Sequence, residues 1–110
     1  KMKEIETYEE FKQTIEIDAE DKLVIVDFWA SWCGPCKMIG PKFKKLEEEG
    51  DFKEAIFCKV DVDENEETAE ECEVEAMPTF QLYKSGAKVD EISGSEWDDI
   101  LDMIKKHYEE

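Results

Sequence analysis

Two cysteines separated by two residues, Cys33 and Cys36, are the side chains of this sequence best suited to covalent chemistry. They follow a nearly continuous apolar run and precede a segment with helical periodicity, so the pair is expected at the first turn of a helix. Backbone N–H groups and the helix dipole stabilise an anion there, and cysteines so placed have lowered thiol pKa values. We expect Cys33, at the exposed end, to be a nucleophilic thiolate. Cys36, one turn into the helix, is expected to resolve the mixed disulfide that Cys33 forms.

A zinc site is the structural alternative for a cysteine pair of this spacing. Structural zinc commonly takes four ligands, often from a second Cys-x-x-Cys or a spaced pair of histidines. The sequence has one histidine, His107, which we interpret as a solvent-facing residue of an acidic tail. The remaining cysteines, Cys58 and Cys72, stand alone inside apolar segments and are interpreted as small buried apolar side chains. No metal is therefore expected.

Apolar periodicity predicts an α/β fold around the cysteine pair. Strands are expected at residues 23–29, 56–62, 79–83 and 88–92, with a weaker one at the N-terminus. Helices are expected at 8–18, from Pro35 to just before Gly50, at about 65–73, and from Ser95 through Tyr108. The run at 23–29 is apolar at nearly every position, which is typical of a central strand covered on both faces. The strand–helix–strand order implies parallel strands, and a hairpin at Ser85-Gly86 adds antiparallel strands at the other side of the sheet.

Local signals predict where these helices begin. Thr7 and Glu10 have the spacing of a capping box, and Ser95 with Asp98 suggests a similar start for the last helix. Pro41 falls inside the second helix and is expected to kink it.

The length of 110 residues fits one domain, 1–110, and its charge excludes several classes of partner. There are 14 lysines, no arginine and 31 acidic residues, which gives a net charge of −17. A surface this acidic is repelled by phosphate backbones and anionic lipid, so neither nucleic acid nor a membrane is an expected partner. No apolar run approaches the roughly 20 residues that a membrane-spanning helix needs.

The cysteines indicate a reducing compartment. Four cysteines could form two disulfides, but Cys58 and Cys72 lie alone in apolar segments while Cys33 and Cys36 are close together. Residues 1–6 lack the apolar region of a signal peptide. We therefore expect a cytoplasmic protein in which Cys33 and Cys36 are a working redox pair.

The sequence resembles the thioredoxin family over essentially its whole length and in the order of its elements. The segments that carry this resemblance are Phe28 through Cys36 to Pro41, with Trp-Cys-Gly-Pro-Cys-Lys at 32–37, then Met77-Pro78-Thr79-Phe80, Gly86 and Gly94. The resemblance implies the thioredoxin fold, a single mixed sheet of about five strands flanked by about four helices. Animal forms often carry a cysteine just before Met-Pro, but Ala76 stands there, so a monomer rather than a disulfide-linked dimer is expected.

The resemblance also gives roles to two charged residues. Asp27 interrupts the apolar run and would be a buried carboxyl behind Cys36, acting through water as a general acid/base for that thiol. The alternative is a carboxylate at a strand end that reaches solvent. Lys59, in the neighbouring strand, corresponds to a lysine that family members have near this carboxyl, although an exposed Lys59 is also compatible with the sequence.

A docking surface for protein substrates is the next implication of the resemblance. Pro78 is expected to follow a cis peptide bond, although such bonds are only about 5–6% of X–Pro bonds in general. Its turn would place the Met77 backbone against the cysteines, where an extended client peptide could pair with it. The other residues expected in this flat, weakly apolar patch are Trp32, Gly34, Pro35 and Gly94.

The expected function is that of a general protein-disulfide reductase with no bound cofactor. The family implies that NADPH supplies the electrons through a flavoprotein thioredoxin reductase, and that clients are disulfide-containing proteins such as peroxiredoxins. An oxidase or isomerase of the same fold is one alternative, but oxidising relatives usually carry a histidine where Gly34-Pro35 stands here. A redox-switched protein-binding module is the alternative from a different class.

Overall fold

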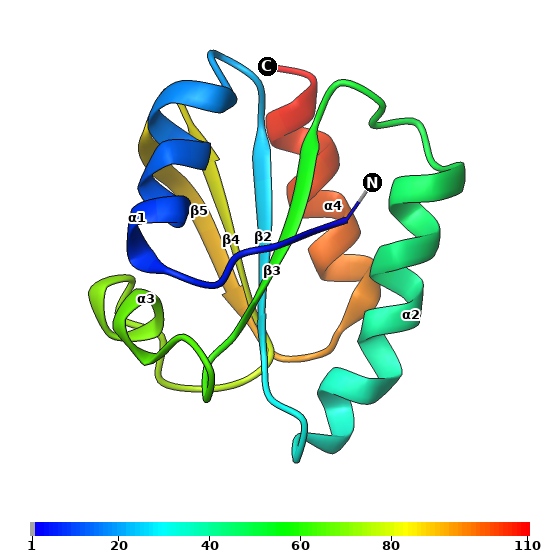
Figure 1. Ribbon diagram of the computed structural model, residues 1–110. Helices are drawn as coiled ribbons and strands as arrows, with labels where there is room; N and C mark the ends of the chain where they lie inside the picture. The colour runs from blue at the N-terminus through cyan, green and yellow to red at the C-terminus, as the bar shows by residue number, and fades with distance from the viewer. Residues whose placement is uncertain (1) are drawn as a thin grey trace.

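A five-stranded mixed sheet forms the centre of the computed structural model, which describes residues 2–110. The elements in chain order are β1 (Lys3–Glu4), α1 (Tyr8–Gln13), a π-helical turn (Thr14–Asp18), β2 (Val24–Trp29), α2 (Gly34–Glu49), β3 (Ile56–Asp61), α3 (Glu66–Glu71), β4 (Thr79–Lys84), β5 (Ala87–Ser93) and α4 (Trp97–Tyr108). Figure 1 shows the strands crossing the middle of the molecule with helices on either side. This is the predicted order of elements.

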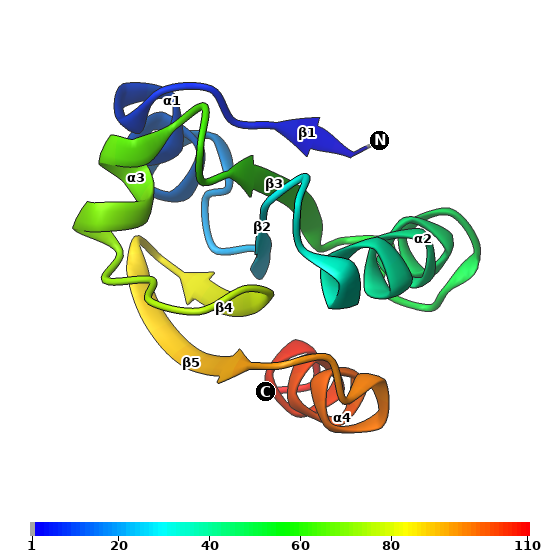
Figure 2. The ribbon, with the colours of Figure 1, turned by 90° about the horizontal axis from the view of Figure 1, so that it is seen from below.

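The strand order is β1-β3-β2-β4-β5, so β2 lies at the centre of the sheet, as its apolar sequence predicts. β1, β3 and β2 run parallel, whereas β4 and β5 form an antiparallel hairpin beside β2. In Figure 2, α1 and α3 cover one face of the sheet, and α2 and α4 cover the other. The carboxyl end of β2 leads directly into α2, so the cysteine pair stands at one edge of the sheet.

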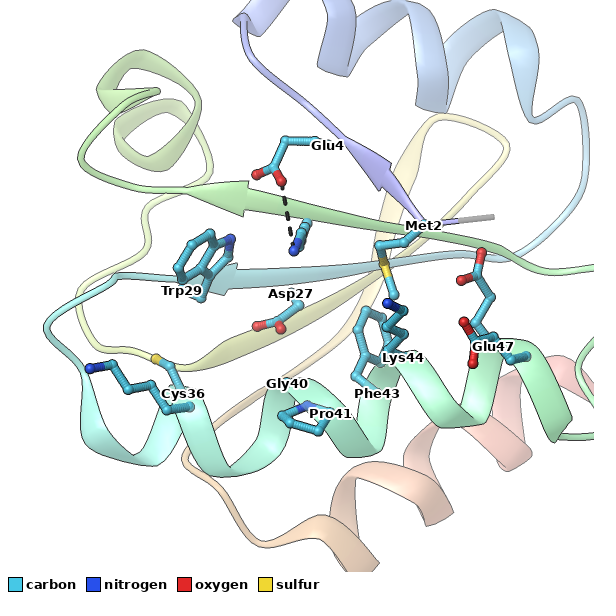
Figure 3. Close-up of a pocket in the computed structure, with 13 residues that line it drawn as sticks. Met2, Glu4, Asp27, Trp29, Cys36, Gly40, Pro41, Phe43, Lys44 and Glu47 are labelled. Carbon is cyan, nitrogen blue, oxygen red and sulfur yellow. Dashed lines mark ion pairs between the residues drawn. The ribbon is translucent and has the colours of Figure 1, made fainter.

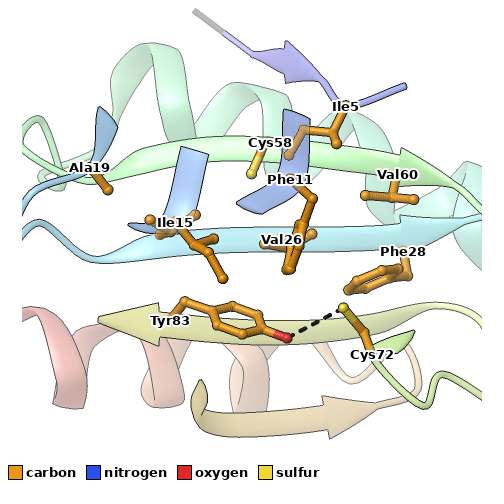
Figure 4. Packing of buried hydrophobic residues seen from close by; sticks show 11 residues of the cluster. Ile5, Phe11, Ile15, Ala19, Val26, Phe28, Cys58, Val60, Cys72 and Tyr83 are labelled. Atoms are coloured by element: carbon orange, nitrogen blue, oxygen red, sulfur yellow. Dashed lines mark hydrogen bonds between the residues drawn. The ribbon is translucent and has the colours of Figure 1, made fainter. Parts of the chain in front are cut away.

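Alternating side chains of the central strand divide the core between the two faces. Val24, Val26 and Phe28 pack toward α1 in the cluster of Figure 4, while Ile25 packs with Phe43 of α2 on the other face. Asp27 belongs to this second face by the same alternation. A carboxyl group is therefore held in the layer between the sheet and α2.

The first helix starts as predicted but ends differently. The Glu10 N–H donates to Thr7 Oγ1 at 3.0 Å, and Glu10 Oε1 accepts from the Glu6 N–H at 2.8 Å, which confirms the cap. The α-helix ends at Gln13, and residues 14–18 form a π-helical turn rather than the continuous helix expected to 18. Its wider hydrogen bond runs from the Ala19 N–H to Thr14 O at 3.0 Å.

Two predictions about the last helix are wrong. α4 begins after Glu96 with no side-chain cap, so Ser95 does not have the capping role expected of it. His107 is only 7% exposed rather than solvent-facing. Its spacing of seven and three residues from Ile100 and Ile104 puts it on the inner, apolar side of the helix, which explains the burial.

Candidate active site

Cys33 and Cys36 form a disulfide at the N-terminus of α2, with their Cα atoms 5.3 Å apart. Cys33 is the N-cap residue, and its extended backbone (φ −90°, ψ 110°) turns the chain from β2 into the helix. The Cys36 N–H points at Cys33 Sγ, 3.1 Å away. Pro35 lies in the first turn, where its missing N–H costs nothing and its fixed φ suits a helix. The local sequence thus places Cys33 Sγ where an N-capping oxygen would normally lie.

Exposure does not distinguish the two cysteines, contrary to the expectation that Cys33 is the exposed one. Cys33 is 5% and Cys36 is 4% exposed, because Ala30, Trp29 and Met77 pack around the disulfide. Their surroundings differ instead. Cys33 Sγ lies 3.7 Å from the Met77 carbonyl oxygen, whereas Cys36 lines a groove on the other side of the disulfide.

The expected cis peptide bond is present between Met77 and Pro78 and brings the Met77 backbone beside Cys33. Gly94 supports this turn, because its N–H donates to Pro78 O at 2.8 Å. Gly94 has φ +116°, a conformation that an L side chain would strain. The turn and the loop after β5 are therefore joined on the Cys33 side of the site.

The other residues of the predicted docking patch differ in exposure. Trp32 is 66% exposed, Gly34 and Pro35 are exposed, and Met77 and Gly94 are half-buried. Pro78 is buried, so of the Met77-Pro78 pair it is the Met77 side that reaches the surface.

Asp63 is a further residue of this site, and no sequence motif predicted it. Its Oδ2 accepts a 2.8 Å hydrogen bond from the Trp32 indole Nε1–H and thereby fixes an otherwise exposed ring. The Asp63 N–H donates in turn to Asp61 Oδ1 at 2.9 Å, in the turn after β3. Because β2 and β3 are parallel and pair Trp29 with Asp61 at their ends, the loops that follow them lie at the same edge. That adjacency was the available signal for Asp63.

Asp27 faces Cys36 across a groove of about 980 Å³ that lies between α2 and the β1–β3–β2 side of the sheet. Figure 3 shows the side chains of Asp27 and Cys36 directed into it from β2 and α2. Asp27 is 3% exposed, and its Oδ1 has no hydrogen-bond partner among residues 2–110. The groove lining consists of Met2, Glu4, Asp27, Trp29, Cys36, Lys37, Gly40, Pro41, Phe43, Lys44, Glu47, Glu48 and Lys59.

Burial raises the pKa of Asp27 from 3.8 to about 7, because the ionised carboxylate loses its hydration. Lys59 opposes this rise by attracting the carboxylate, and Glu4 adds to it by repulsion. The burial contradicts the alternative of a carboxylate that reaches solvent from a strand end.

Lys59 is the strand neighbour of Asp27 across β2 and β3, but its ammonium group lies elsewhere. Lys59 Nζ is 3.7 Å from Glu4 Oε1 and 5.3 Å from the centre of the Trp29 ring. Its side chain is 38% exposed, which fits the exposed alternative better than a buried pair.

The isolated cysteines are buried thiols in the core, as predicted. Cys58 packs in the cluster beneath α1, and burial raises its thiol pKa far above the usual range. Cys72 lies 3.5 Å from the Tyr83 hydroxyl, a contact marked in Figure 4. Neither is part of the site around Cys33.

Comparison with known proteins decides the family. A family model described as Thioredoxin matches residues 2–106 of this chain. The chain belongs to the thioredoxin family. It is 51% identical to thioredoxin from Homo sapiens over 94 residues, covering 86% of this chain and 87% of that protein. It is 49% identical to thioredoxin from Geodia cydonium over 104 residues, covering 94% and 95%.

Solved thioredoxin structures have the same architecture. The Fasciola hepatica thioredoxin matches with a TM-score of 0.92 and 40% identity, covering 96% of this chain and 99% of that one. The Malassezia sympodialis thioredoxin matches with a TM-score of 0.89 and 42% identity, covering 97% and 93%. The five-stranded mixed sheet with four helices is therefore the thioredoxin fold. As a thioredoxin, the protein is a protein-disulfide oxidoreductase, with Cys33–Cys36 as its redox-active disulfide.

No helix within residues 2–110 has the length and apolar character needed to cross a membrane.

Proposed function

We propose that this thioredoxin is a general protein-disulfide reductase in which Cys33 attacks the client and Cys36 resolves the intermediate. The observation that carries the proposal is the position of Cys33 Sγ at the N-terminus of α2, 3.1 Å from the Cys36 amide nitrogen. In the dithiol form, that N–H and the helix dipole stabilise a Cys33 thiolate. Thioredoxins are themselves a standard example of such a lowered thiol pKa.

The reaction exchanges two disulfides through one intermediate. The Cys33 thiolate attacks one sulfur of the client disulfide, forms a Cys33–client bond and releases the other client sulfur as a thiolate. Cys36, after losing its proton, attacks Cys33 Sγ, so that the Cys33–Cys36 disulfide forms and the second client thiolate leaves. The client has then gained two electrons. Its two thiolates take up one proton released by Cys36 and one from solvent, and the thioredoxin has reached the oxidised form of the present structure.

Asp27 is the general base for Cys36 and returns a proton to it when the disulfide is reduced again. Its support is geometric and electrostatic: both side chains line one groove, and the carboxyl pKa of about 7 suits proton exchange at neutral pH. Transfer proceeds through water in the groove. Lys59 supports the site only from a distance, since its ammonium contacts Glu4.

Clients dock on the Cys33 side of the molecule. The patch is formed by Trp32, Gly34, Pro35, Met77 and Gly94, with Pro78 beneath it as the buried support of the turn. An extended client segment pairs with the Met77 backbone, whose carbonyl oxygen already lies 3.7 Å from Cys33 Sγ. Backbone pairing requires no particular client side chain, which suits a reductase of many proteins.

The reducing direction follows from the residues between the cysteines and from the source of electrons. Gly34-Pro35 offers no charge that would stabilise the dithiol further, so the pair remains a reductant, as thioredoxins are among such couples. A flavoprotein thioredoxin reductase supplies electrons from NADPH, and clients include disulfide-forming enzymes such as peroxiredoxins. The protein works in the cytoplasm as a monomer.

The test is insulin reduction with dithiothreitol as the electron source. Oxidised protein should accelerate precipitation of the insulin B chain, and a Cys33→Ser variant should give the uncatalysed rate. A protein that binds insulin in one redox state without accelerating its reduction would instead be a redox-switched binding module.

A further inference from the structure

Three charged side chains form a row across the sheet above the active-site groove. β1 and β3 pair Glu4 with Lys59, and β3 and β2 pair Lys59 with Asp27. Residues paired directly across strands project from the same face of a sheet. The row therefore runs from the solvent edge at Glu4 to the buried carboxyl at Asp27, and all three residues line the groove with Cys36.

The lysine in the middle of this row contacts only the outer acid. Lys59 Nζ lies 3.7 Å from Glu4 Oε1, the ion pair marked in Figure 3, and its charge also rests over the Trp29 ring. Asp27 has no ion pair within 4.0 Å among the described residues, and its Oδ1 lacks any hydrogen-bond partner there.

We propose that Glu4 is a positioning residue, which holds the Lys59 ammonium at the outer end of the groove and so leaves the Asp27 carboxyl without a cation in contact. The proposal deepens the function proposed above and rests on it only for its catalytic consequence. A freed Lys59 is one strand away from Asp27 and has the reach to turn inward. It would then hold the carboxyl ionised and make it a poorer proton donor at neutral pH.

Other charges around the groove do not substitute for Glu4. The remaining charged lining residues, all on α2, are Lys37, Lys44, Glu47 and Glu48. Burial, Lys59 and Glu4 are the influences on the pKa of Asp27, in that order. The ion pair itself is exposed, with 38% of the Lys59 and 43% of the Glu4 side chain accessible, so its contribution to stability is small. If the pair were merely structural, removing Glu4 would change the titration of Asp27 only through the loss of its direct repulsion, to the same extent with and without Lys59.

The experiment follows the side-chain carboxyl carbon of Asp27 by ¹³C NMR in the reduced, full-length protein between pH 4 and pH 9. Glu4→Gln should lower the titration midpoint of Asp27 by about half a pH unit or more. Glu4→Asp keeps the charge and should stay close to the parent. Glu6→Gln is the matched control, because it removes the same charge two residues further along the chain and should move the midpoint by less than about 0.2 units.

A second background tests whether the effect passes through Lys59. In a Lys59→Gln protein, Glu4→Gln should have a clearly smaller effect, since only the direct repulsion between Glu4 and Asp27 is left to remove. Equal midpoints in Glu4→Gln and Glu6→Gln, or an undiminished effect without Lys59, would overturn the proposal.

The pH profile of a second reaction separates this inference from the proposed function. The rate at which Cys36 resolves a preformed Cys33 mixed disulfide should shift with pH in step with the Asp27 midpoint of the Glu4→Gln protein. A shifted midpoint with an unshifted rate profile would support the role of Glu4 at the carboxyl and contradict that of Asp27 in proton transfer.

Discussion

Asp27 shows at the scale of one residue how burial raises the pKa of a carboxyl group at the expense of stability. Apart from Asp27, all residues from Val24 to Phe28 are apolar and buried, so the carboxyl lies in an apolar layer of the core. Its pKa of about 7 is raised above the 3.8 of an exposed carboxyl. The unfolded chain therefore releases this proton before the native state does. Stability from this group is fully present below about pH 4 and is lost as the pH rises toward the folded pKa.

Asp27→Asn should accordingly be more stable than the parent at pH 7, by about 1–3 kcal/mol. The asparagine never ionises, although the buried amide it introduces offsets part of the gain. Urea unfolding at pH 7 and at pH 4 measures the free energy of unfolding of both proteins. The difference in stability between them should nearly vanish at pH 4. The variant should also reduce disulfides more slowly, because Cys36 loses its proton acceptor. A variant less stable than the parent at pH 7 would mean that an ion pair with Lys59 dominates.

At the scale of elements, the buried His107 side chain connects the C-terminal helix α4 to the β4–β5 hairpin. Both ring nitrogens of His107 face carboxylates: Nε2 lies 2.8 Å from Asp90 Oδ2 on β5, and Nδ1 lies 3.1 Å from Glu110 Oε1. Lys84 Nζ adds a contact to the His107 carbonyl oxygen at 3.5 Å. The imidazole therefore connects the end of α4 to the edge strand β5.

His107→Gln should lower the free energy of unfolding by about 1–2 kcal/mol, since one amide cannot replace both hydrogen bonds to charged partners.

The hydrogen bond from His107 also lowers the pKa of Asp90, so this contribution is present above the unfolded pKa near 3.8 and is lost as the pH falls through the lower folded value. Between pH 6 and pH 3, Asp90→Asn should lose less stability than the parent. Asp102→Asn, on the exposed side of α4, should follow the parent. If the free energies of unfolding of the parent, Asp90→Asn and Asp102→Asn fell in parallel with pH, the contact between His107 and Asp90 would not contribute to stability.

Sequence patterns predicted those elements whose signals are local. A signal of only a few residues predicted each of three features: the apolar run of β2, Pro35 at the start of α2 and Thr7 at the start of α1. The π-helical turn was missed because a helical apolar period does not distinguish it from an α-helix.

Features that depend on neighbours distant in the chain were harder to predict. Asp63 reaches Trp32 across 31 positions, and His107 finds Asp90 across 17. Strand pairing places Lys59 beside Asp27, but the Lys59 ammonium forms its ion pair with Glu4 instead. Predicting such pairs requires knowing the order of the strands and which loops lie at the same end of the sheet. The motifs near Cys33 do not give this information.

The net charge of −17 belongs to the scale of the whole molecule, because it surrounds the proposed, largely apolar docking patch with acidic surface. Basic clients should therefore associate faster than acidic ones of similar size. Stopped-flow tryptophan fluorescence reports on association, and the rate for a basic client should fall severalfold between 10 mM and 150 mM salt as the field is screened. A neutral client of similar size is the control and should be nearly insensitive. Equal salt dependence for both clients would remove charge steering from the account.

The division of labour between the two cysteines is the central claim and can be tested by trapping. Cys36→Ser leaves a thiolate that attacks but cannot be released, so clients should accumulate as mixed disulfides on Cys33. Cys33→Ser removes the thiol at the helix cap and should abolish both turnover and trapping. The measurement is a non-reducing gel of each variant after incubation with disulfide-containing client, followed by identification of the linked cysteine by mass spectrometry. The account predicts a client adduct at Cys33 in the Cys36→Ser protein alone, whereas equal trapping by the two variants would contradict it.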